Sequence, residues 1–270
     1  MSVPVARELD LMMHDLHVQS IARTSATIPA VHMGGMFTAA VEALFPGLCP
    51  HCEQPLPGGS RGLCGACWAS LVPRVGSACP RCGVPADDST EVCLECLRSA
   101  PPQRSTVVWG EHDGVLRTAV LSLKHHRRDD FAQPLGFRLA AAVAPASWEP
   151  SIDAVCSVPS HPFRRFRRPW AAADLLARSV GSRLDKPVVK LLRRHGLHRQ
   201  AGLSRARRLE LPCQSFSASP RARGLTILLI DDVTTTGSTV RRASEALVRA
   251  GAEAVHCAVL AHAPDSRRFS

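Results

Sequence analysis

Residues 228–239 of the chain read LLIDDVTTTGST, which joins an apolar run, two adjacent acids and a short stretch of threonine and glycine. The apolar residues 225–230 (LTILLI) predict a buried strand, and residues 238–250 predict a helix that Gly251 ends. Open parallel sheets bind ligands at the carboxyl ends of their strands, and the amide groups at a helix N-terminus attract phosphate. The segment therefore predicts an anion site between a strand and a helix.

Two kinds of side chain in this segment suit a sugar phosphate. The carboxylates of Asp231 and Asp232 suit the vicinal hydroxyls of a ribose, or a Mg²⁺ ion held near them. An alternative is an ordinary core strand followed by a capped helix, in which Asp232 and Thr234 serve only as turn residues. Four hydroxyls can add hydrogen-bond donors around a phosphate: Thr235, Thr236, Ser238 and Thr239.

The order of acids, threonines and glycine separates this segment from the common nucleotide-binding motifs. It contains neither GxxxxGK[ST] nor GxGxxG. Its apolar strand, paired acids and TTGxT turn resemble the signature with which type I phosphoribosyltransferases bind 5-phosphoribosyl 1-pyrophosphate (PRPP). The resemblance implies a parallel sheet, a small hood and a flexible loop over the site.

Outward from this segment, predicted strands and helices alternate along the chain. Such alternation predicts an α/β fold, a mainly parallel sheet with helices on both faces. Residues 195–222 are expected to form a long basic loop, which in a compact domain is typically a lid, a binding loop or disordered. Strands are expected at residues 106–109, 153–159, 187–192 and 254–260, and helices at residues 115–124, 131–143 and 170–183.

Four CxxC pairs precede this region. The start of the sequence lacks the layout of a secretory signal, so a reducing, cytoplasmic compartment is expected, in which thiolates bind metal rather than form disulfides. Two CxxC turns together can hold one tetrahedral Zn²⁺ with no open position. We therefore predict two consecutive structural zinc ribbons, Cys49/Cys52/Cys64/Cys67 and Cys79/Cys82/Cys93/Cys96. The spacing also allows an interleaved arrangement in which the first pair joins the third.

Composition restricts the class of protein further. A length of 270 residues, with 45% hydrophobic and 21% charged side chains, is typical of one or two folded domains. No apolar run approaches the ~20 residues that a bilayer-spanning helix needs, so membrane insertion is not expected. The net charge of +10 is concentrated, because residues 161–223 contain sixteen Lys and Arg but three acids. This stretch is expected to attract phosphates, or to be a solvated arginine-rich face.

The order of two predicted zinc ribbons followed by the segment of residues 228–239 resembles the ComF family of competence-associated phosphoribosyltransferases. The resemblance extends over residues 45–263. Further landmarks are HDG at residues 112–114, LKH at 123–125, SVPSH at 157–161 and the region 200–208. The resemblance implies zinc in the ribbons, Mg²⁺ with PRPP, and a loop of residues 158–164 against the pyrophosphate. The PRPP-binding residues that it implies are Asp231, Asp232, Val233, Thr234, Thr235, Thr236, Gly237, Ser238, Thr239, Ser160 and His161.

Transfer from PRPP passes through an oxocarbenium-like state, which favours positive groups at the pyrophosphate and a loop that excludes water. The catalytic residues implied are Asp231, Asp232, Arg164 and Arg208, and Lys124 is a further candidate. Residues 168–173 read RPWAAA where the family usually has R-G-F-N-Q-A, and residues 197–211 also depart from its pattern. These departures leave the acceptor open.

Two functions follow from these features. The chain is predicted to be a phosphoribosyltransferase of unknown acceptor. The alternative is a non-catalytic PRPP- or phosphate-binding protein that acts on single-stranded DNA, or with competence or DNA-processing proteins, through residues 161–223. The expected domains are a partly disordered arm (1–44), a double zinc ribbon (45–102) and a phosphoribosyltransferase-like domain (103–270).

Overall fold

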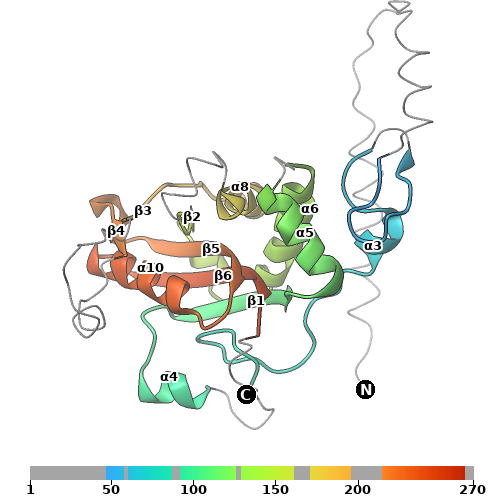
Figure 1. Cartoon of the computed structure of the whole chain (residues 1–270). Coiled ribbons are helices and arrows are strands. Elements are labelled where there is room, and N and C mark those ends of the chain that lie inside the picture. The colour runs from blue at the N-terminus through green and yellow to red at the C-terminus, as the bar shows by residue number, and fades with distance from the viewer. Residues whose placement is uncertain are drawn as a thin grey trace, which may run out of the picture. The chain divides into compact units, whose positions relative to one another are not determined.

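The computed structural model describes residues 47–57, 60–86, 92–125, 129–160, 171–195 and 215–264 (Figure 1). Contacts divide the chain into one unit of Met1–Phe45 and a second of Pro46–Ser270, so every described element belongs to the second unit. The predicted N-terminal arm and most of the predicted basic loop lie outside the described residues.

A parallel sheet of four strands forms the centre of this unit, in the order β1-β6-β5-β2. The predicted α/β fold with a parallel sheet is therefore confirmed. β5 continues four residues past its apolar run to Thr234, because Val233 and Thr234 still pair with Ala261 and His262. The strands are β1 (Ser105–Glu111), β2 (Ala154–Ser157), β5 (Thr226–Thr234) and β6 (Ala254–His262).

Helices cover both faces of the sheet (Figure 1). α10 (Ser238–Arg249) packs on one face, and α6 (Asp129–Val143) and α8 (Ala172–Leu184) pack on the other. α5 (Gly114–His125) follows β1 and contacts α6. Among the described helices, none combines the length and the apolar character needed to cross a membrane.

Alternation along β5 divides its buried side chains between two cores. Leu228 and Ile230 belong to the core shared with α6 and α8. Ile227 and Leu229 belong to the core shared with α10. Successive side chains of a strand point to opposite faces, so a strand buried on both sides reads as a continuous apolar run.

The strand predicted at residues 187–192 is wrong, and the predicted loop of residues 195–222 contains a strand. Val188 makes only an isolated bridge to Val155. β3 (Leu192–Arg194) begins where the predicted strand was to end, and it pairs antiparallel with β4 (Phe216–Ala218). Phe216 is buried against the core of α10, and one apolar residue among serines produces no pattern that predicts a strand. The described residues also include two short 3-10 helices, η2 (Glu149–Ser151) and η3 (Pro220–Ala222).

Two zinc ribbons with the same local backbone precede the sheet. We call the ribbon that contains Cys49 to Cys67 ribbon 1, and the ribbon that contains Cys79 to Cys96 ribbon 2. Each has a short helix after its third cysteine: α3 (Gly65–Ala69) in ribbon 1 and α4 (Leu94–Arg98) in ribbon 2. In each, the residue after the second cysteine has a left-handed backbone, with φ of 62° at Glu53 and 72° at Gly83. The internal sequence repeat is therefore a structural repeat.

Ribbon 1 packs against the helices of the sheet domain. The ring of Trp68 in α3 lies 5.7 Å from that of Phe131, and the Arg138 guanidinium lies over it and donates a hydrogen bond to the Trp68 carbonyl. Cys49 and Cys67 belong to the same core as Phe131. The position equivalent to Trp68 in ribbon 2 is Leu97, which is 66% exposed. Only the first copy of the repeat therefore contributes its helix to this core.

Ribbon 2 lies against β1, and Gly83 makes that contact possible. A Cβ atom at Gly83 would stand 2.5 Å from Cγ2 of Val108, and its φ of +72° is unfavourable for other residues. We expect Gly83→Ala to lower the free energy of unfolding by about 2–4 kcal/mol, from backbone strain and overpacking together. Denaturant unfolding of the zinc-loaded protein measures the loss.

Gly76→Ala is the matched control for this substitution. Gly76 also has a left-handed backbone, with φ of +105°, but a Cβ atom there meets nothing within 4 Å. Its loss should be limited to about 1–2 kcal/mol of backbone strain. Equal losses for the two variants would contradict a close contact of ribbon 2 with β1.

Candidate functional site

The eight paired cysteines form two separate clusters. Their sulfur atoms lie within 4.8 Å of one another in each group, Cys49/Cys52/Cys64/Cys67 and Cys79/Cys82/Cys93/Cys96. The consecutive arrangement is therefore confirmed, and the interleaved one is wrong. Four sulfur ligands fill a tetrahedral zinc site, so these sites are structural.

Backbone amides prepare one thiol of each cluster for metal. Burial raises the pKa of the Cys49 thiol, but backbone N–H groups, including those of Cys52 and Cys64, outweigh it and lower that pKa to about 6. The same balance lowers the pKa of Cys79 to about 7. Because the thiolate is the form that binds metal, both clusters fit Zn²⁺.

The two adjacent carboxylates of β5 point to opposite faces of the sheet. Because side chains alternate along β5, Asp231 lies with Leu229 on the face that α10 covers. Asp232 lies with Ile230 on the face that α6 and α8 cover. Asp231 is 8% exposed, whereas the Asp232 side chain is 18% exposed. The pair therefore offers one enclosed and one partly open carboxylate at the carboxyl end of the strand.

Burial changes the chemistry of Asp231. Burial, together with the negative charge of Asp232, raises the pKa of this carboxyl to about 8. The backbone N–H of Asp232 donates to Asp231 Oδ1 at 2.9 Å and partly opposes the shift. Near neutral pH, Asp231 is therefore largely protonated and is able to donate a hydrogen bond.

Asp232 is paired with a cation from α5. Lys124 Nζ lies 3.3 Å from Asp232 Oδ2. His112 directly follows β1 and lies close to both Lys124 and Asp232. Burial is the main cause that lowers its pKa, and the positive charge of Lys124 lowers it further. Its buried Nε2 atom has no hydrogen-bond partner within the described residues. From the sequence, His112 was singled out only as part of the HDG landmark and not as a site residue; its position shortly after the strand predicted at residues 106–109 was the available signal.

The residues after Asp232 form an exposed turn at the start of α10. Thr235, Thr236 and Ser238 are exposed, whereas Thr234 is buried at the end of β5. Gly237 is the N-cap of α10 with φ of 72°, and it brings no side chain to cap the first amide groups. We call residues 234–239 the phosphate loop, after the sequence-based prediction that they bind a phosphate. The predicted residues Val233 and Thr239 are half-buried beside these exposed hydroxyls.

A second cluster lies at the end of β2, the neighbour of β5. Ser160 lines a cleft with three cations, Lys190, Arg193 and Arg194. In the same cleft, the Ser157 hydroxyl donates a short hydrogen bond to Asp174 Oδ1. The other predicted residues of the pyrophosphate loop and lid, His161, Arg164 and Arg208, lie outside the described residues.

Family models match two parts of the chain. A double zinc ribbon domain matches residues 40–97, and a phosphoribosyl transferase domain matches residues 173–270. The second match contains β5, the phosphate loop and α10. The fold and these matches define a protein with a phosphoribosyltransferase domain behind a double zinc ribbon.

Relatives cover most of the chain. The DNA utilization protein YhgH of Salmonella typhi is 35% identical over 78% of this chain and 94% of its own length. YhgH of Escherichia coli (strain K12) is 34% identical over the same shares. Competence protein F of Haemophilus influenzae is 28% identical over 80% of this chain and 96% of its own. The chain therefore belongs to the ComF family, with YhgH and competence protein F.

Two solved structures match with lower identity. The allosteric regulatory enzyme of purine biosynthesis is 18% identical, with a TM-score of 0.38. The glutamine PRPP amidotransferase from B. subtilis is 22% identical, with a TM-score of 0.37. In both comparisons the match covers 52% of this chain and 30% of the other.

Proposed function

We propose that the chain binds PRPP with Mg²⁺ and transfers its phosphoribosyl group to an acceptor. The observation that carries the proposal is the Asp232–Lys124 pair beside the exposed hydroxyls of the phosphate loop. A carboxylate for ribose hydroxyls and a helix N-terminus whose N-cap residue, Gly237, has no side chain then lie at one end of β5. Carboxylate oxygens are also the ligands that Mg²⁺ prefers.

The reaction breaks the bond between C1 of the ribose and the pyrophosphate oxygen, and the pyrophosphate leaves with the electron pair. The acceptor forms the new bond to C1 and loses its proton. Asp232 would hold the ribose hydroxyls and the phosphate loop the 5′-phosphate, whereas Asp231, enclosed on the other face of the sheet, would act through the hydrogen bond that it accepts from the backbone N–H of Asp232. Ser160 and the basic residues around it would hold the leaving pyrophosphate. In this proposal Arg164 and Arg208 act on the same leaving group.

We also propose a cytoplasmic location for the protein, because a reducing compartment keeps cysteines as thiolates that can bind zinc.

Titration calorimetry with PRPP and Mg²⁺ tests the proposal. We expect Asp232→Asn to weaken PRPP binding roughly 10- to 100-fold, because a charge-assisted hydrogen bond contributes about 1.5–3 kcal/mol. Asp185→Asn is the matched control: it makes the same charge change at the C-cap of α8, where the left-handed backbone (φ of 54°) tolerates asparagine. Absence of heat from the wild-type protein at millimolar PRPP would contradict the proposal.

The names of the relatives favour a second candidate, a role with DNA. The relatives are named for DNA utilization and competence. In the basic stretch, Lys190 and Arg193 are exposed and line the cleft at Ser160. A phosphate-binding protein without transferase activity would release no pyrophosphate from PRPP, and Asp232→Asn would leave its salt-dependent binding of single-stranded DNA unchanged.

A further inference from the structure

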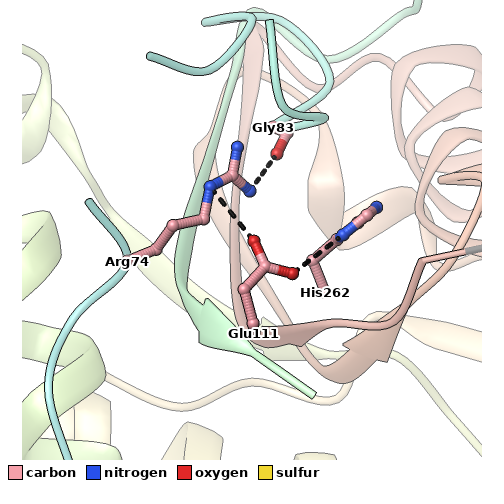
Figure 2. Close-up of polar contacts among 4 residues, drawn as sticks. All are labelled: Arg74, Gly83, Glu111 and His262. Carbon is pink, nitrogen blue, oxygen red and sulfur yellow. Dashed lines mark hydrogen bonds and ion pairs between the residues drawn. The ribbon is translucent and has the colours of Figure 1, made fainter. Parts of the chain in front are cut away.

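The linker between the two ribbons is fixed to ribbon 2 and to β1 by one buried arginine. The side chain of Arg74 is 7% exposed. Its Nη1 donates to the carbonyl of Gly83 at 3.1 Å, and its Nε lies 3.3 Å from Glu111 Oε1 (Figure 2). The backbone N–H of Arg74 also donates to the carbonyl of Trp109 in β1 at 2.7 Å. Ribbon 2 is therefore held against the sheet at the carboxyl end of β1.

Glu111 continues the contact to the end of β6. Its Oε2 atom lies 3.3 Å from Nδ1 of His262, so the carboxylate stands between Arg74 and His262 (Figure 2). His262 pairs in register with Glu111 on one side and with Thr234 on the other. The N–H of Ala263 donates to the carbonyl of Thr234 at 2.8 Å. Polar contacts, together with the backbone from His262 to Ala263, thus connect ribbon 2 with the first residue of the phosphate loop.

A second contact joins ribbon 2 to the other side of the same loop. Arg241, in the first turn of α10, donates through Nη2 to the Ser99 hydroxyl at 2.6 Å and through Nη1 to the Ser99 carbonyl at 3.3 Å. Ser99 is the C-cap of α4 in ribbon 2. The backbone N–H of Arg241 donates to the carbonyl of Gly237 at 2.9 Å. Ribbon 2 therefore contacts the structure on both sides of the loop.

We infer that ribbon 2 sets the geometry of the phosphate loop, and that Arg74 and Arg241 are its positioning residues. The inference rests on the proposed function, because it assigns the loop to the 5′-phosphate. Only Thr235 and Thr236 separate the end of β5 from the N-cap of α10, so a displacement of either end moves the amide groups of the loop. Binding to prearranged donors is sensitive to such displacements.

The test compares Arg74→Gln with Arg138→Gln. Each arginine donates a hydrogen bond to a ribbon carbonyl: Arg74 to that of Gly83 in ribbon 2, and Arg138 of α6 to that of Trp68 in ribbon 1. Of the two, only Arg74 is connected to the phosphate loop. Ribose 5-phosphate is the probe, titrated below the melting temperature of both variants, and pyrophosphate is the reference ligand. We expect Arg74→Gln to weaken ribose 5-phosphate binding roughly 5- to 50-fold, as typical coupling between sites does, and to leave pyrophosphate binding within twofold. Arg138→Gln should leave both affinities near the wild-type value.

Arg241→Gln tests the second contact with little risk to folding. Arg241 is half-buried on α10, and its exposed neighbour Arg242 provides the control Arg242→Gln. We expect about a 3- to 10-fold loss of ribose 5-phosphate affinity for Arg241→Gln, because its hydrogen bonds to Ser99 are lost. The same affinity for Arg241→Gln and Arg242→Gln would show that this contact does not position the loop.

Hydrogen exchange separates failure of this inference from failure of the proposed function. The amides of residues 235–241 should exchange faster in Arg74→Gln than in Arg138→Gln, whether or not the protein binds a sugar phosphate. If the wild-type protein ignores ribose 5-phosphate but this exchange difference is present, the positioning role stands and the proposed function fails. If the wild-type protein binds the probe and both variants match it in affinity and exchange, the positioning role is overturned and the proposed function stands.

Discussion

Removal of zinc is expected to destabilise the whole described unit, because ribbon 1 shares its core with the sheet domain. Structural zinc contributes about 10–16 kcal/mol to the folding of isolated zinc-finger peptides, which is as much as the total stability of a typical domain. Cys49, Cys67 and Leu63 lie in the same apolar core as Phe131 and Leu116. We therefore expect chelation to lower the melting temperature by more than about 15 °C. Thermal unfolding followed by circular dichroism measures the shift.

Metal analysis and single-site variants make this expectation more specific. The purified chain should contain two zinc ions, one for each cysteine cluster. Cys67→Ser and Cys96→Ser should each remove one ion. The loss of stability should be larger for Cys67→Ser, because Cys67 is part of the core with Phe131 whereas Cys96 is in neither apolar core of the described residues. Re-addition of zinc to the chelated protein is the control. An unchanged melting temperature after complete metal removal would contradict a shared core.

Asp231→Asn is expected to stabilise the ligand-free protein at alkaline pH. Burial raises the pKa of Asp231 to about 8 in the folded state, whereas an unfolded aspartate titrates near its usual value of 3.8. A carboxyl with a raised folded pKa contributes its stability at low pH and loses it as the pH rises through that pKa. Between pH 4 and pH 8 this single group should therefore lower the free energy of unfolding by several kcal/mol, at about 1.4 kcal/mol per pKa unit.

The variant should not show this loss. Asparagine keeps an oxygen that accepts the N–H of Asp232 but carries no charge to desolvate. Wild type and Asp231→Asn should have similar stability near pH 5, and the variant should be more stable by about 2–4 kcal/mol at pH 8. Denaturant unfolding at both pH values measures the difference, and the comparison at each pH cancels any effect on the zinc sites. Asp185→Asn should show no such dependence. A wild-type protein as stable as Asp231→Asn at pH 8 would contradict the burial of a carboxyl.

Periodicity and cysteine spacing were sufficient for most of the fold. The run LTILLI predicted β5 because a strand buried on both sides needs apolar side chains at every position, and the four CxxC pairs predicted both clusters of sulfur ligands. The antiparallel pair β3–β4 was missed because Phe216 is its one deeply buried side chain. A local sequence pattern does not indicate two short strands whose stability comes from contacts with distant elements.

The candidate site was only partly predictable, for a related reason. The sequence places Asp231 and Asp232 next to each other, but the end of β5 determines whether their side chains lie on the same face of the sheet. Continued pairing of Val233 and Thr234 with β6 keeps both acids in the strand and sends them to opposite faces. The Lys124–Asp232 pair joins residues far apart in the chain, so its geometry could not be read from spacing. Neither could the path from ribbon 2 to the phosphate loop, which crosses three elements.

The contact between Trp68 and Phe131 has a consequence for the order of events during synthesis. Ribbon 1 can capture its metal as soon as Cys67 has left the ribosome, since all four ligands lie within a short local stretch. The apolar side of that ribbon has nothing to pack against until the segment with Phe131 emerges, more than sixty residues later. If ribbon 1 binds zinc at this stage, Trp68 is expected to stay uncovered until Phe131 has been synthesised.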